Sequence, residues 1–125
     1  MAELLSGFYH ITQSENINET DWKVRVMLNP QHSLYAGHFP QQPVVPGVCT
    51  LQMIKECLEK IYRTPLQYKQ IASCKFLSVI NPDETPELNF SFTIKRSEPD
   101  TLQVLVEGAS SKEVCIKLKA LLADK

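Results

Sequence analysis

The sequence predicts an α+β domain in which an antiparallel sheet of about six strands wraps around one long central helix. Two observations predict this fold class: short segments in which apolar and polar residues alternate, and a single segment with helical spacing. Because no further helices are expected to connect parallel strands, the sheet should be antiparallel. The chain has 125 residues, which suit one hydrophobic core and are too few for two ordinary domains. We expect a single domain over residues 1–125.

Period-two patterns predict the strands. The clearest pattern runs from Leu88 to Ile94, where every second residue is apolar, as in a half-buried strand. Similar or less regular patterns cover residues 8–13, 22–28, 68–77, 102–106 and 114–118. Turn sequences lie between some of these segments, at Asn81-Pro82-Asp83 and at Glu98-Pro99-Asp100. The count of about six strands follows from these segments.

The helix is predicted from Pro46 or Gly47 to about Tyr62. Its broad apolar face consists of Leu51, Ile54, Leu58, Ile61 and Tyr62. A narrow polar stripe lies beside that face and consists of Gln52, Glu56, Glu59 and Arg63. A single helix with so wide an apolar face is best buried by a sheet that curls around it.

Net charge and sequence signals argue against several classes of protein. The formal net charge of -1 argues against a general nucleic-acid binder, which would normally carry a basic excess. The sequence shows neither a signal peptide nor an apolar run long enough to span a membrane, so a cytoplasmic protein without membrane insertion is expected.

The four cysteines, Cys49, Cys57, Cys74 and Cys115, form no CxxC pair and lie in apolar stretches. They are expected to be buried free thiols, with neither zinc nor disulfides.

A proline-rich segment precedes the helix and contains His38. Three prolines occur within the seven residues from Pro40 to Pro46, and each restricts its own backbone and that of the preceding residue. Such a stiff segment could hold His38 in a defined relation to the helix. A neutral imidazole can act as a general base, although a loop histidine bonded to the backbone is the commoner case. His10 and His32 have no comparable setting and receive no role.

The start of the helix has no side-chain cap in the sequence. Pro46 suits the first helical position, and the Gly47 and Val48 amides would then be free donors. Residues 43–45 are Pro, Val and Val, so no Ser, Thr, Asp or Asn precedes the helix. A ligand carbonyl oxygen could accept from these amides, since glycine lets it approach closely. The alternative is an ordinary helix start capped by water.

The pattern GHFPxxPxxPGV from Gly37 to Val48 resembles the signature of the β-hydroxyacyl-acyl-carrier-protein dehydratases of the FabZ and FabA type. Weaker similarity follows at Lys75-Phe76 and at Asn81-Pro82-Asp83-Glu84. The resemblance therefore covers the chain by motif from Gly37 to Glu84. It implies a hot-dog fold, which is an antiparallel sheet around one helix and agrees with the independent prediction above.

The resemblance also implies a reaction. His38 would remove the α-proton of a (3R)-hydroxyacyl thioester while the Gly47 amide polarises the carbonyl, to give a trans-2-enoyl thioester and water. Substrate binding beside His38 and Gly47 would involve Phe39, Pro46 and Val48. The implied partner is acyl carrier protein bearing the 3-hydroxyacyl group, and no cofactor or metal is implied. A homodimer is expected because the family's second subunit completes the site, with a trimer of dimers or a heterodimer with a related subunit as alternatives.

The sequence departs from the family pattern on the helix. The family's helix acid falls on Gln52, and the glutamine that usually follows one turn later falls on Glu56. In one interpretation Glu56 serves as the acid and Gln52 orients the hydroxyl or a water. In a second, the displaced carboxylate leaves a non-catalytic acyl-thioester binder or partner subunit. A hot-dog thioesterase is a third alternative, and the spacing alone would favour a solvated polar stripe.

Overall fold

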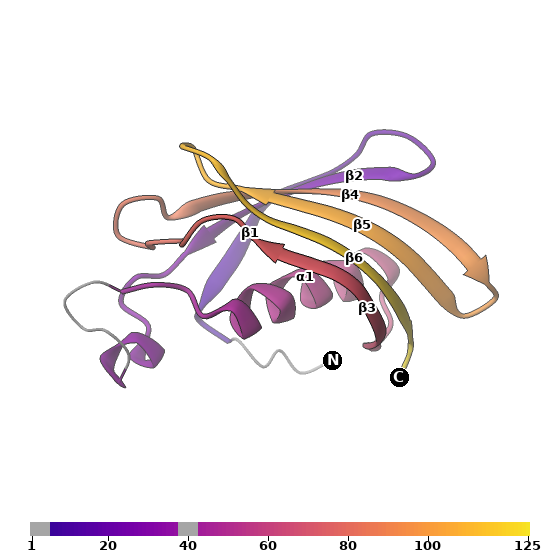
Figure 1. The fold of residues 1–125 in the computed structure, drawn as a ribbon, viewed down its shortest axis with the longest axis horizontal. Coiled ribbons are helices and arrows are strands. Elements are labelled where there is room, and N and C mark those ends of the chain that lie inside the picture. The colour runs from indigo at the N-terminus through magenta and orange to yellow at the C-terminus, as the bar shows by residue number, and fades with distance from the viewer. Residues whose placement is uncertain (1–5, 38–42) are drawn as a thin grey trace.

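The computed structural model describes residues 6–37 and 43–125, and these residues form a curved sheet over one helix (Figure 1). The sheet has six antiparallel strands in the order β1-β2-β4-β5-β6-β3. Its strands are β1 (Tyr9–Asn16), β2 (Asp21–Leu28), β3 (Leu66–Phe76), β4 (Glu87–Glu98), β5 (Thr101–Ala109) and β6 (Val114–Asp124). All six predicted strand segments are confirmed, and so is the antiparallel arrangement.

Helix α1 (Gly47–Tyr62) lies on the concave side of the sheet (Figure 1). Its bounds agree with the prediction. With 16 residues, however, it is of ordinary length and is not the long helix that was expected. Pro46 is also placed differently, because its extended backbone (φ -60°, ψ 144°) makes it the N-cap, and Gly47 is the first helical residue. The preceding extended segment explains this shift of one position.

The core lies between α1 and the inner face of the sheet. Met53, Ile54 and Leu58 on the helix have no exposed surface, and Phe90 and Phe92 on β4 are almost as buried. The most buried helical face is thus centred on Met53 and Ile54. The predicted apolar residues Leu51, Ile61 and Tyr62 lie at its margins and are only partly buried. The difference arises because small or polar residues, Cys49, Thr50, Glu56 and Cys57, also lie inside.

Three of the four cysteines, Cys49, Cys57 and Cys115, are buried as expected. The expectation is wrong for Cys74, which is only partly buried. Pro99 and Asp100 form the turn between β4 and β5. Within the described residues, no helix is long and apolar enough to cross a membrane.

Gly108 on β5 provides a test of this core. A Cβ atom there would lie 2.8 Å from Ile116 Cγ2 and 2.8 Å from Phe90 Cε1, and both of those side chains are 1% exposed. Neither neighbour can move into solvent. We expect Gly108→Ala to lower the free energy of unfolding by about 1–3 kcal/mol, measured by urea denaturation. Gln103→Ala, on the outer face of the same strand, should change it by less than about 0.5 kcal/mol.

Candidate active site

A short 3-10 helix, η1 (Ser33–Gly37), immediately precedes the predicted base in the sequence. Its Tyr35 is buried, and the Tyr35 ring stacks on that of Phe8 with centroids 5.4 Å apart. The Phe8 ring also meets the His32 ring edge-on at 5.3 Å, and His32 Nδ1 accepts from the Leu34 amide at 3.0 Å. His32 therefore has a structural setting. His38 and Phe39 themselves lie outside the described residues.

The start of α1 has no side-chain cap hydrogen bond from its N-cap residue, as the sequence predicted. Pro46 makes no side-chain cap, and its carbonyl oxygen accepts from the Cys49 and Thr50 amides at 2.9 and 3.2 Å. The Gly47 and Val48 amides have no acceptor in the described part of the chain. Val48 is 73% exposed. A ligand oxygen could therefore accept hydrogen bonds at this helix end, where the helix dipole favours negative charge.

Gly47 has a second reason to be glycine, one that sequence reasoning missed. A Cβ atom at this position would lie 2.8 Å from Cζ of Phe76, the last residue of β3. The aromatic ring therefore covers the helix start at very close range. Phe76 belongs to the Lys75-Phe76 pair noted in the sequence, but its contact with Gly47 depends on how β3 packs beside α1.

Glu56 is the most unusual residue of the polar stripe, because it is only 2% exposed. Its Oε1 accepts a hydrogen bond from the Tyr9 hydroxyl at 2.8 Å, and its Oε2 accepts from Gln52 Nε2 at 2.9 Å. The structure thus brings two predicted site residues, Gln52 and Glu56, into direct contact. The prediction of a solvated stripe is wrong at this position.

Tyr9 is a residue that sequence reasoning missed at this site. It lies at the start of β1, and its separation from Glu56 is 47 residues. Its place in a strand was predictable from the apolar pattern. No local signal connects its hydroxyl to the helix, so only the packing of β1 against α1 could reveal the contact.

The other half of the polar stripe has structural roles. Glu59 Oε2 accepts from the Leu66 amide at 2.8 Å, which ties the helix to the start of β3. Arg63 follows the helix in the left-handed conformation (φ 55°) and is exposed. These two residues therefore do not extend the Gln52–Glu56 pair.

A cysteine nucleophile is not favoured beside the helix start. Burial raises the pKa of the Cys49 thiol above its ordinary value, so the thiol stays protonated at neutral pH. Burial has the same effect on the pKa of Cys74. The thiolate that a covalent thioester mechanism needs is therefore disfavoured at both positions.

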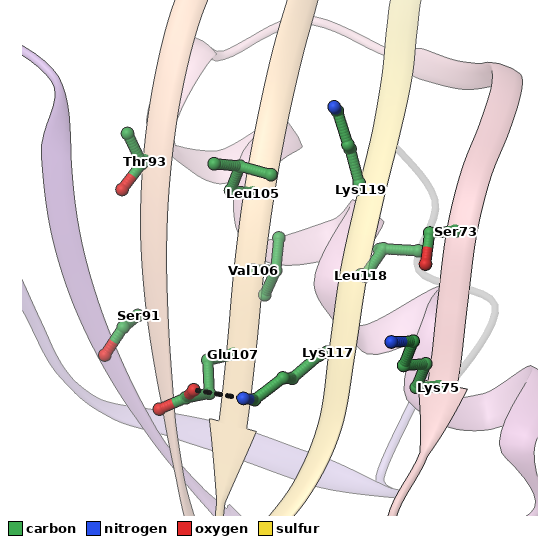
Figure 2. A pocket seen from close by; sticks show the side chains of 10 residues that line it. All are labelled: Ser73, Lys75, Ser91, Thr93, Leu105, Val106, Glu107, Lys117, Leu118 and Lys119. Carbon is green, nitrogen blue, oxygen red and sulfur yellow. Dashed lines mark ion pairs between the residues drawn. The ribbon is translucent and has the colours of Figure 1, made fainter.

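A separate hollow of about 440 Å³ lies on the outer face of the sheet (Figure 2). Lys75, Lys117 and Lys119 line it, and Lys117 pairs with Glu107 at 3.9 Å. The Lys117 and Glu107 side chains are 57% and 50% exposed, so this is a solvated surface. Val106 and Leu118 alternate with these charged residues along β5 and β6, and both are buried in the core. The charged side chains therefore lie on the face of the sheet opposite α1. The hollow is therefore distinct from the site at the helix.

Comparison with known proteins decides the family. Residues 13–115 match the family model described as ApeI-like, ApeI dehydratase. The chain belongs to the ApeI-like dehydratase family. The match includes all of α1, and with it Gln52 and Glu56. The resemblance to dehydratases is thus supported through the ApeI-like family, and the comparisons do not extend it to the FabZ and FabA type.

Solved structures show that this ApeI-like protein has the hot-dog fold. The ApeI:P dehydratase heterocomplex from Xenorhabdus doucetiae matches with a TM-score of 0.74 and 16% identity, over 91% of this chain and 96% of that chain. A hypothetical thioesterase with coenzyme A from Streptococcus pneumoniae matches with a TM-score of 0.67 and 11% identity, over 98% and 91%. A putative thioesterase from Lactococcus lactis has a TM-score of 0.67 and 10% identity, over 98% of both chains. No protein of curated function matches the sequence.

Proposed function

We propose that this ApeI-like protein dehydrates a (3R)-hydroxyacyl thioester to a trans-2-enoyl thioester. The match of residues 13–115 to a dehydratase family carries the proposal. The uncapped helix start and the buried Gln52–Glu56 pair support it, because elimination needs a carbonyl donor and a group for the departing hydroxyl. Acyl carrier protein is the proposed carrier of the thioester, and the cytoplasm is the proposed location.

The first half of the reaction is assigned to the helix start and the segment before it. His38 takes the α-proton, and the electrons of that C–H bond form the new double bond. The Gly47 amide donates to the thioester carbonyl oxygen and stabilises the negative charge that develops there. Phe39, Pro46 and Val48 would surround the pantetheine end of the substrate.

The second half is assigned to Glu56 with Gln52. The C–O bond breaks, and the leaving hydroxide accepts a proton and departs as water. Glu56 is the proposed proton source. Because its carboxyl is 2% exposed and Gln52 is only partly buried, Gln52 would hold the hydroxyl or a bridging water at the substrate. The proton would pass from Glu56 along that water.

A second subunit is proposed to cover an apolar patch beside the helix start. This helix-start patch consists of Val48, Phe76, Leu77 and Val79, which are 73%, 54%, 51% and 78% exposed. The Val45 amide donates to the Ile80 carbonyl at 2.9 Å, so the two segments that form the patch are adjacent. β3 also ends the strand order and leaves one edge unpaired within the described sheet. Exposed apolar surface next to a free strand edge favours a subunit interface.

The patch can be tested with Val79→Asp. A charge buried in the subunit interface should be costly, so we expect the variant to shift the protein from dimer to monomer and to lose thioester turnover, measured by sedimentation velocity and product assay. Leu105→Asp is the control, because Leu105 is 49% exposed on the outer face of the sheet. A wild-type monomer, or a Val79→Asp dimer of unchanged affinity, would contradict the interface.

The reaction is tested with 3-hydroxyacyl and 2-enoyl thioesters of acyl carrier protein and of coenzyme A. Mass spectrometry should detect loss or gain of one water. The double variant Gln52→Glu, Glu56→Gln places the two groups in the order of the FabZ and FabA type and should retain or raise the rate. No product from the wild type or from this double variant would exclude the dehydratase. Release of free thiol would instead identify a thioesterase.

A non-catalytic partner subunit is the second candidate function. Two observations favour it: Gln52 has no carboxyl group to donate a proton, and both oxygens of Glu56 accept hydrogen bonds inside the subunit. A related fold occurs in a dehydratase heterocomplex. The candidate predicts binding of the acylated carrier protein without turnover, and turnover once a catalytic relative is added.

A further inference from the structure

Tyr9, Glu56 and Gln52 form a chain of hydrogen bonds from the sheet to the candidate site. We infer that Tyr9 is a positioning residue which, through Glu56, turns the carbonyl end of the Gln52 amide toward the substrate. The inference rests on the proposed function for the identity of the substrate. The contacts that carry it lie within one subunit and can be measured without turnover.

Each contact in this chain has a defined donor and acceptor. In both contacts the Glu56 carboxyl oxygen is the acceptor, and an amide side chain donates from its nitrogen and accepts at its oxygen. Tyr9 donates to Oε1 of Glu56 at 2.8 Å, and this leaves Oε2 for Gln52. Gln52 must then present Nε2, as it does at 2.9 Å. Because Nε2 and Oε1 diverge from the same planar amide carbon, Oε1 is then the atom left to accept a hydrogen bond from another group.

The Glu56 carboxyl is held by hydrogen bonds from two sides. Gln52 and Glu56 are one turn apart on α1, and an exposed pair of this kind would exchange between several rotamers. Glu56 is held on its other side by Tyr9, a residue of β1 that pairs with Leu28 of β2. The sheet thus sets the orientation of the carboxylate, and the carboxylate sets that of the amide.

As a consequence, Gln52 Oε1 is a hydrogen-bond acceptor with a fixed orientation at the candidate site. Gln52 Oε1 would accept a hydrogen bond from the 3-hydroxyl or from the bridging water, so Gln52 orients the leaving group and does not protonate it. Without the Tyr9 hydroxyl, the Glu56 carboxylate could rotate and the amide could reverse. A misdirected amide should lower kcat more than it raises KM, because geometry at the reacting group is lost while the rest of the substrate still binds.

Tyr68 supplies a matched control. Its hydroxyl donates to the Leu51 carbonyl oxygen at 2.7 Å, so it contacts α1 one residue before Gln52 without touching Glu56. Tyr68→Phe and Tyr9→Phe each delete one hydroxyl that bonds to the same helix. Of the two, only Tyr9→Phe removes a hydrogen bond to the Glu56 carboxyl, which orients Gln52.

The direct test is the side-chain amide signal of Gln52 in ¹⁵N NMR spectra of the free protein, assigned by its loss in Gln52→Leu. In Tyr9→Phe we expect the bonded Nε2 proton to exchange with water at least about fivefold faster and the shift difference between the two amide protons to shrink. Tyr68→Phe should leave both values unchanged. An unchanged signal in Tyr9→Phe, or an equal change in Tyr68→Phe, would overturn the inference. If Tyr9→Phe does not fold, Glu56→Asp, which withdraws the carboxylate from Gln52, must change the same signal.

The kinetic test separates this inference from the proposed function. With an active substrate, Tyr9→Phe should lower kcat about tenfold with little change in KM, while Tyr68→Phe stays within about twofold of wild type. Equal losses in both variants would show a general structural effect and overturn the positioning role. If the wild type turns over no substrate, the proposed function fails, and the NMR result alone still decides how Gln52 is oriented.

Discussion

Replacement of His38 by alanine is expected to lower the rate of 2-enoyl thioester hydration by a factor of about 10²–10⁴. The imidazole is the proposed base, and an alanine side chain cannot accept the α-proton. Substrate binding should change little, because the Gly47 amide and the apolar surroundings remain. Stopped assays at saturating substrate give kcat, and titration of a substrate analogue gives the dissociation constant.

His10→Ala is the matched control for this variant. His10 is an exposed residue of β1 to which we assign no role, and its replacement should leave the rate unchanged. A His38→Ala protein with a rate within threefold of wild type would remove the imidazole from the reaction and, with it, the proposed use of the proline-rich segment.

Replacement of Glu56 by glutamine is expected to lower the same rate by at least about 10²-fold. Glutamine nearly preserves the shape of the buried side chain but cannot supply the proton. The amide also offers one acceptor where Tyr9 and Gln52 both donate, so one donor must turn or lose its partner. This should lower the free energy of unfolding by about 1–3 kcal/mol, measured by urea denaturation.

Glu59→Gln is the control for charge removal on the same helix. Glu59 accepts a hydrogen bond from the Leu66 amide and takes no part in the hydrogen bonds that join Tyr9, Glu56 and Gln52. Its variant should keep a rate within about threefold of wild type. An unchanged rate in Glu56→Gln, with a stable fold, would exclude Glu56 as the acid and favour the partner-subunit candidate.

The fold was largely predictable because it depends on local patterns. Alternation of apolar residues such as Leu88, Phe90 and Phe92 requires a strand with one buried face, and the spacing in residues 46–62 requires an amphipathic helix. The uncapped helix start was also predictable, because the cap is a property of the few residues before it. The position of Pro46 was wrong by one residue, since the extended backbone before the helix decides which residue is the N-cap.

The candidate site was predictable only in part. The Gln52 and Glu56 positions follow from a linear motif, and their mutual contact follows from helical spacing. The burial of Glu56 does not follow from spacing, because Tyr9 and Glu56 are separated by 47 residues. The contact of Phe76 with Gly47 likewise depends on where β3 ends beside the helix.

By itself, the sequence determined the strands, the helix and the motif on which the proposed thioester site is based. These features depend on neighbours within a few positions, so a linear pattern contains the information. Only the tertiary structure decided that Glu56 is buried and accepts two hydrogen bonds, and that Gly47 packs against the Phe76 ring. Those outcomes depend on the packing of segments that are distant in the sequence. The curved sheet places Tyr9 of β1 beside Glu56 and Phe76 of β3 beside Gly47.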